Sequence, residues 1–98
     1  IIFKTHPEAS IERNEYRDFY YACSFLLGES FVYISKDCLN RIEENPYLYQ
    51  SKRFGIRKVI FRRFKQHYMA YSIEEEGVFI LAFGHAKRLP YYFTDRLK

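Results

Sequence analysis

Apolar positions in the first half of the chain repeat at helical spacing. After a short β-rich segment at residues 1–6, Pro7 and Glu8 are expected to open a helix, because proline suits the first helical position and an acid favours the first turn. The repeating apolar positions are Ile11, Tyr16, Phe19, Tyr20, Cys23, Leu26 and Leu27. Gly28 is expected to end this helix as its C-cap.

A second helix is expected to begin near Glu29. Its apolar stripe consists of Phe31, Ile34, Cys38 and Ile42. Pro46 should terminate it, because a residue that precedes proline avoids the helical region. Since the two helices are nearly consecutive, we expect them to pair as an antiparallel hairpin, with Phe19, Cys23 and Leu26 facing the second stripe.

Three strands are expected after the helices. Residues 57–63 are apolar on both faces in the middle, which is typical of an inner strand, and residues 68–73 form the next strand. A polar turn ending at Gly77 leads to the fully apolar residues 78–83, which we expect to be a central strand. The helices should lie on Val59, Phe61, Ile80 and Ala82 or their alternates.

This order predicts one domain over residues 1–98, of the α+β class. The expected chain path is a strand, an antiparallel helical hairpin and a three-stranded antiparallel meander. The two helices should cover one face of a small, mainly antiparallel sheet.

The charge of the chain is unevenly distributed. The first 51 residues hold five Lys/Arg and eight Asp/Glu, a net of −3, whereas residues 52–98 hold eleven and four, a net of +7. No acid occurs between Lys52 and Ile73. The basic half is therefore expected to face a polyanion or an acidic partner, with a solvated cationic face as the alternative.

The cysteines, the histidines and the lengths of the apolar runs limit the kind of protein that this chain can be. Cys23 and Cys38 are at apolar positions of the helices, so we expect two buried free thiols and a cytoplasmic protein. His6 and His67 have no partners at metal-ligand spacing, so we expect no metal and no cofactor. The apolar runs are too short to span a bilayer, and no signal peptide is visible.

Several segments resemble the RelE/ParE superfamily of bacterial toxins. Ile42-Glu43-Glu44-Asn45-Pro46-Tyr47-Leu48-Tyr49 matches the end of the family's second helix, and Arg57-Lys58-Val59-Ile60-Phe61-Arg62-Arg63-Phe64 matches its following strand. A tyrosine-bearing strand follows at residues 68–71. Relatives usually open that strand with F-P-Y, whereas residues 64–68 lack the proline and are one residue longer, which changes the expected turn.

The tail gives the most specific match. ParE-like members end in H-x-x-R-x-P-x-Y-W/F-x-x-R, and His85-Ala86-Lys87-Arg88-Leu89-Pro90-Tyr91-Tyr92-Phe93-Thr94-Asp95-Arg96 fills every position. RelE-type ribonucleases usually carry an arginine directly after the glycine of the last strand, where this chain has His85. The tail therefore resembles the ParE-like branch more closely.

This resemblance implies the toxin of a type II toxin–antitoxin pair. A ParE-like protein would bind and poison DNA gyrase without catalytic residues. A RelE-like protein would cut mRNA on the ribosome through the RNA 2′-hydroxyl, and a third alternative is a toxin fold that serves only as a binding module. In each case the implied partner is an acidic, partly disordered antitoxin that also sets the oligomeric state.

The candidate target-binding residues are the basic and aromatic side chains of the second half. They are Arg57, Arg62, Arg63, His85, Arg88, Tyr92 and Arg96, with Lys52 and Arg53 as further cations. If the protein is a nuclease, His85, Arg88, Arg57 and Tyr92 are the catalytic candidates, since RNA cleavage needs a base, an acid and cations. The alternatives are that His85 pins the tail, that the strand arginines are rim charges, and that the tail aromatics pack on the sheet.

Overall fold

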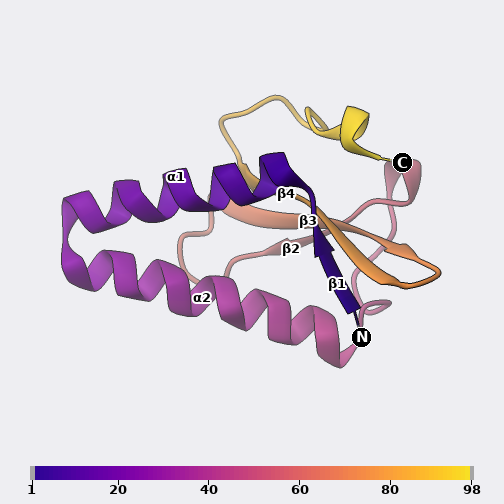
Figure 1. Ribbon diagram of the computed structural model, residues 1–98, viewed down its shortest axis with the longest axis horizontal. Coiled ribbons are helices and arrows are strands. Elements are labelled where there is room, and N and C mark those ends of the chain that lie inside the picture. Colours follow the sequence, from indigo (N-terminus) through magenta and orange to yellow (C-terminus); the bar gives the residue numbers. More distant parts are fainter. Residues whose placement is uncertain (1, 98) are drawn as a thin grey trace.

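The computed structural model describes residues 2–97 and has the α+β architecture expected from the sequence. Strand β1 (Ile2–Thr5) leads into helices α1 (Pro7–Cys23) and α2 (Phe25–Glu44), and strands β2 (Arg57–Ile60), β3 (His67–Glu74) and β4 (Gly77–His85) follow. A tail then returns over the sheet to a single 3₁₀ turn at Thr94–Arg96. Figure 1 shows the helical hairpin, the sheet and the tail in these positions.

The four strands form one mixed sheet in the order β1-β4-β3-β2. β2, β3 and β4 make the expected antiparallel meander, and β1 pairs with β4 in parallel. The apolar strand β4 is internal, as expected. The expectation of an inner strand at residues 57–63 is wrong, because β2 lies at the edge and ends at Ile60, before the chain turns through Arg62 and Arg63.

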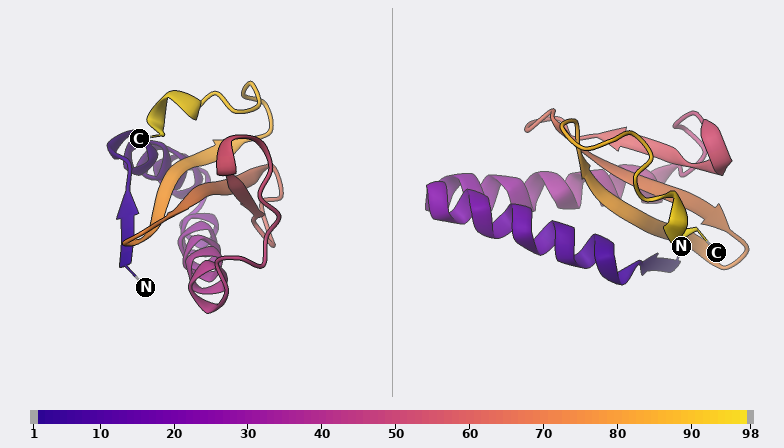
Figure 2. Two further views of the ribbon diagram at one scale, coloured as in Figure 1. Left: turned by 90° about the vertical axis from the view of Figure 1, so that its right-hand side faces the viewer. Right: turned by 90° about the horizontal axis from the view of Figure 1, so that it is seen from above.

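The two helices cover one face of this sheet. Ala9 of α1 and Phe31, Cys38 and Ile42 of α2 share one core cluster with Phe61 and with residues of all three meander strands, namely Val59, Met69, Tyr71, Val78, Ile80 and Phe83. The hairpin extends past the end of the sheet (Figures 1 and 2). Part of each helix therefore has no sheet beneath it.

The hairpin turns earlier than the sequence pattern indicated. α1 ends at Cys23, and Ser24 adopts an extended conformation and caps α2 by accepting a hydrogen bond from the Leu27 amide at 3.1 Å. Gly28 therefore lies inside α2 rather than ending α1. A Cβ at Gly28 would collide with the ring of Tyr21, so the glycine permits close approach of the two helices near their turn.

The buried face of α1 is also rotated relative to the expected stripe. Ala9 and Glu12 are its buried residues, whereas Ile11 and Phe19 are exposed. Leu26 is exposed too, and of the two free thiols Cys38 is buried but Cys23 is exposed. The expected packing of Phe19, Cys23 and Leu26 against the second stripe is therefore wrong, because α1 places tyrosines and one carboxylate against the sheet.

A β-bulge in β4 changes which residues face the helices. Ala70 pairs with Ala82 and Tyr71 with Ile80, so Leu81 has no residue opposite it. As a result Ile80 and Phe83 face the helices, while Leu81 and Ala82 face the tail together with Phe93. The expectation for Ala82 is wrong for this reason, whereas those for Val59, Phe61 and Ile80 are confirmed.

Candidate functional site

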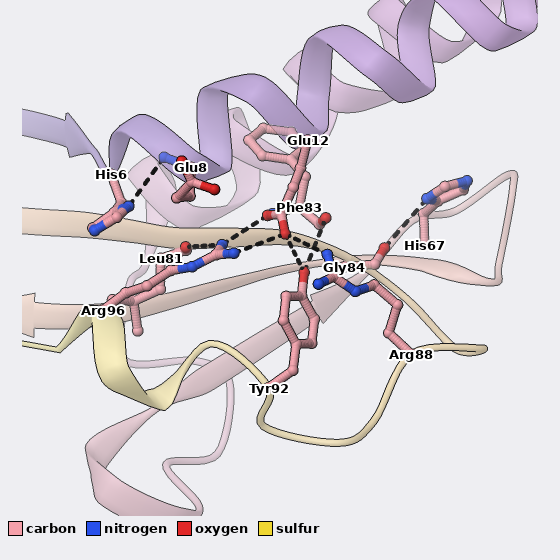
Figure 3. Close-up of polar contacts among 10 residues, drawn as sticks. All are labelled: His6, Glu8, Glu12, His67, Leu81, Phe83, Gly84, Arg88, Tyr92 and Arg96. Atoms are coloured by element: carbon pink, nitrogen blue, oxygen red, sulfur yellow. Dashed lines mark hydrogen bonds and ion pairs between the residues drawn. The ribbon is translucent and has the colours of Figure 1, made fainter.

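The tail is attached to the rest of the molecule by the carboxylate of Glu12 on α1. Glu12 is only 7% exposed. It accepts hydrogen bonds from the Arg88 guanidinium at 2.7 Å and from the Tyr92 hydroxyl at 2.7 Å, both through Oε2. Arg96 donates to both carboxylate oxygens, at 2.9 and 3.0 Å (Figure 3). Three candidate residues of the tail thus meet at one carboxylate.

The same carboxylate completes the hydrogen bonding of β4. Parallel pairing with β1 ends where the His6 amide donates to the Ile80 carbonyl. Beyond that point the Phe83 amide donates to Glu12 Oε1 at 3.1 Å, and the Leu81 carbonyl accepts from Arg96 at 3.1 Å. Side chains therefore satisfy backbone groups that a longer β1 would otherwise pair.

The two arginines at this carboxylate differ in exposure. The Arg96 side chain is 10% exposed and makes three hydrogen bonds, so its role is to anchor the tail. The Arg88 side chain is 45% exposed, and its guanidinium carbon lies 3.6 Å from the centre of the Tyr92 ring. Arg88 therefore presents part of a held guanidinium to solvent, where it can contact a carboxylate or phosphate.

The Tyr92 hydroxyl is hydrogen-bonded to the buried Glu12 carboxylate. Burial raises the pKa of its hydroxyl, and the hydrogen bond to Glu12 raises it further. The hydroxyl therefore stays protonated at neutral pH as a donor to Glu12.

His85 lies at the end of β4, next to the buried His67, which the sequence analysis considered only as a metal ligand. The rings of His85 and His67 are 4.8 Å apart. His67 lies 2.9 Å from the Tyr20 hydroxyl through Nε2 and 3.2 Å from the Gly84 carbonyl through Nδ1. Because a carbonyl can only accept, Nδ1 of His67 carries the proton and Nε2 accepts from Tyr20.

His85 is half-buried, and its Nδ1 accepts a hydrogen bond from the Lys87 amide at 3.0 Å. This contact fixes the first turn of the tail. It also assigns the proton of the neutral ring to Nε2.

Arg57 lies far from His85. It is paired with Tyr71, four residues along β3 from His67, which corresponds to about 13 Å of strand. Its guanidinium donates to the carbonyls of Tyr47 and Tyr49 and holds the segment after α2. The structure therefore does not bring the four nuclease candidates together.

The remaining candidate cations are dispersed over the surface. Arg62 is 3.5 Å from Asp37, and Arg63 donates to the Ser30 hydroxyl at 3.3 Å, so both connect the turn after β2 to α2. Lys52 and Arg53 are exposed. Arg53 lies 5.4 Å from the centre of the Tyr91 ring, on the sheet face that the tail covers.

Glu12 is the residue that sequence reasoning missed. A glutamate in a helix rich in charges is usually solvated, and residue type alone does not distinguish Glu12 from Glu8 or Glu15. The available signal was the spacing of Ala9, Glu12 and Tyr16, which places them on one helical face.

Among residues 2–97, no group of three or more His, Cys, Asp or Glu side chains could hold a metal ion, and no helix is long and apolar enough to cross a membrane. Comparison of the sequence with family models finds no match, and comparison with curated proteins finds none either.

Replacing Glu12 with alanine is expected to destabilise the protein by about 3–5 kcal/mol, because it leaves the buried Arg96 without its counter-charge. Urea unfolding measures this change. The matched control is Glu15→Ala on the exposed side of the same helix, which should cost less than about 0.5 kcal/mol. Equal stability of the two variants would show that the carboxylate does not hold the tail.

His67 should make the protein less stable in mild acid. Burial, assisted by the nearby His85, lowers the pKa of His67 to about 4 from the ordinary histidine value of 6.5. Between those pH values the unfolded chain binds a proton at this residue and the folded protein does not, so stability is lost as the pH falls. From pH 7 to 4.5 the loss should be about 2 kcal/mol. In His67→Gln the unfolding free energy should fall by about 2 kcal/mol less than in the wild type over the same pH range. A variant whose pH profile equals that of the wild type would contradict this assignment.

Proposed function

We propose that this protein is the toxin of a bacterial type II toxin–antitoxin pair of the RelE/ParE superfamily, and that it acts by binding DNA gyrase rather than by cutting RNA. The sequence supports the family through the tail pattern from His85 to Arg96. The fold is compatible with it, since a helical hairpin precedes an antiparallel meander.

One observation carries the choice of mechanism. Of the four side chains that a nuclease would need, Arg88 and Tyr92 bond to the protein's own Glu12, and Arg57 is separated from His85 by about 13 Å along the sheet. A catalytic group must reach the reacting atoms together with its partners. A dispersed set favours a toxin that works by binding.

The proposed contact with the target is the half-exposed guanidinium of Arg88, in the turn that follows His85. The ring of Tyr92 and the carboxylate of Glu12 hold this guanidinium in place, so little conformational entropy is lost when it binds. A fixed guanidinium binds a carboxylate or phosphate through two parallel hydrogen bonds. Both groups are available on a gyrase–DNA complex.

The antitoxin is proposed to be an acidic segment that covers the basic half of the chain. Lys52, Arg53 and Lys65 are exposed there, and the sequence has no acid between residues 52 and 73. The antitoxin would also set the oligomeric state of the complex. The most direct candidate to test is the protein encoded beside this chain.

Brief expression in a bacterial host tests the proposed target. We expect DNA damage signalling and loss of plasmid supercoiling before protein synthesis slows, and rescue by the neighbouring gene product. Rapid arrest of translation with cut mRNA would instead indicate the ribonuclease. Unaffected growth would indicate a binding module without toxic activity.

Three substitutions then test the proposed surface and mechanism. Arg88→Ala should abolish growth inhibition while the protein remains folded and still binds the antitoxin, because Arg96 retains the anchor. Lys87→Ala, which removes the neighbouring exposed cation, is the matched control and should remain toxic. His85→Ala should weaken a gyrase binder only modestly, whereas a nuclease that uses this histidine would lose ~100-fold or more in rate. Full toxicity of Arg88→Ala would contradict the proposed surface.

A further inference from the structure

Lys58 lies on β2 beneath the tail, and three aromatic rings lie close to its ammonium group. It pairs with Ala70, so its side chain is on the sheet face that the tail covers. The ammonium nitrogen lies 4.3 Å from the centre of the Tyr91 ring, 4.7 Å from that of Tyr68 and 5.8 Å from that of Phe93. We call these three rings the lysine cage. They replace part of the water that an exposed lysine would bind.

The backbone of the tail fixes the position of one ring of the lysine cage. Tyr91 has a φ of 58°, in the left-handed region that residues with a side chain rarely adopt. Such a conformation persists only where surrounding contacts hold it. The Tyr91 ring is 6.0 Å from the Phe93 ring, and the guanidinium carbon of Arg53 is 5.4 Å from its centre. The lysine cage is therefore a defined part of the fold.

No carboxylate of the described chain neutralises the ammonium of Lys58. Lys4 pairs with Glu76 at 2.6 Å, whereas Lys58 has no ion pair among residues 2–97. Burial lowers the pKa of Lys58, and the positive charge of Lys52 lowers it further. Lys58 thus has a larger fraction of neutral amine than a lysine with the ordinary pKa, and the neutral amine is the nucleophile.

The cations around the lysine cage suit an anionic reagent. The Tyr91 ring lies close to both the Arg53 guanidinium and the Lys58 ammonium. Lys52 and Arg53 are exposed, and the sequence has no acid between residues 52 and 73. These two cations can bind a phosphate group. An acyl group attached to that phosphate is then held near the amine of Lys58, which raises its effective concentration.

We propose that Lys58 is a site of N-acylation by acyl phosphates. The neutral amine attacks the carbonyl carbon, so that a C–N bond forms and the C–O bond to the phosphate breaks. The phosphate leaves with the electron pair of that bond, and the nitrogen loses a proton to solvent. The product is a neutral amide beside the three rings in place of a cation. The proposal concerns the reactivity of one side chain and does not depend on the proposed gyrase target.

The test incubates the whole chain with acetyl phosphate and follows the acetylation of each lysine by peptide mass spectrometry. We expect the initial rate at Lys58 to exceed the rates at the exposed Lys65 and Lys87 by ~5-fold or more. In urea this difference should disappear, because the lysine cage is no longer formed. A rate at Lys58 no higher than at the two exposed lysines would overturn the proposal. So would a preference for Lys58 that persists in the unfolded chain.

Two matched variants test the role of the neighbouring cation. Lys52→Gln removes a charge that both acts on the Lys58 amine and can bind the phosphate, so it should slow acetylation of Lys58 by ~3-fold or more. Lys65→Gln makes the same change of charge in the turn after β2 and should leave the rate at Lys58 nearly unchanged. Equal slowing by both variants would overturn the proposal, because the reagent would then be attracted by the overall charge of the protein. No slowing by Lys52→Gln would overturn it as well.

Discussion

The structure depends on one buried negative charge. Glu12 is held against the sheet by α1, and a carboxylate in that position is stable only if cations and hydrogen-bond donors surround it. Arg88, Tyr92 and Arg96 supply them, and all three come from the tail. Their convergence brings Phe93 onto the second face of the sheet, where it packs with Leu81 and Ala82. The carboxylate thus secures a core that the helices do not reach.

Because the tail residues must surround the Glu12 carboxylate, some of them serve to anchor the tail and only Arg88 keeps a surface that can bind a partner. Arg96 and Tyr92 bond to Glu12 inside the protein, and part of the Arg88 side chain is left at the surface. The spacing of the tail residues is therefore a structural requirement first, since each must reach Glu12. Any function of the tail uses what this arrangement leaves exposed, and a motif that resembles a family's need not mark a catalytic set.

The sequence predicted the elements better than their contacts. The α+β class, the hairpin, the meander and the internal position of β4 follow from periodicity and turn residues, and they are confirmed. The end of α1 was placed wrongly because Gly28 suggested a cap, whereas its function is to admit Tyr21. The bulge at Leu81 could not be predicted, because an uninterrupted apolar strand carries no signal for it.

The candidate site was predicted in part. Arg88, Tyr92 and Arg96 were named as candidates, and they gather around a carboxylate more than seventy residues earlier in the chain. Long-range pairing of this kind has no local signature. Arg57 and His85 were grouped by chemistry alone, and the register of the sheet separates them.

A double-mutant cycle between Glu12 and Arg96 tests the central claim most directly. Glu12→Gln, Arg96→Met and the double variant would be compared with the wild type in urea unfolding. If the buried pair holds the tail, the free-energy changes are non-additive, with a coupling of about 2–3 kcal/mol. Additivity within about 0.5 kcal/mol would contradict the account, because the carboxylate and the guanidinium would then act independently.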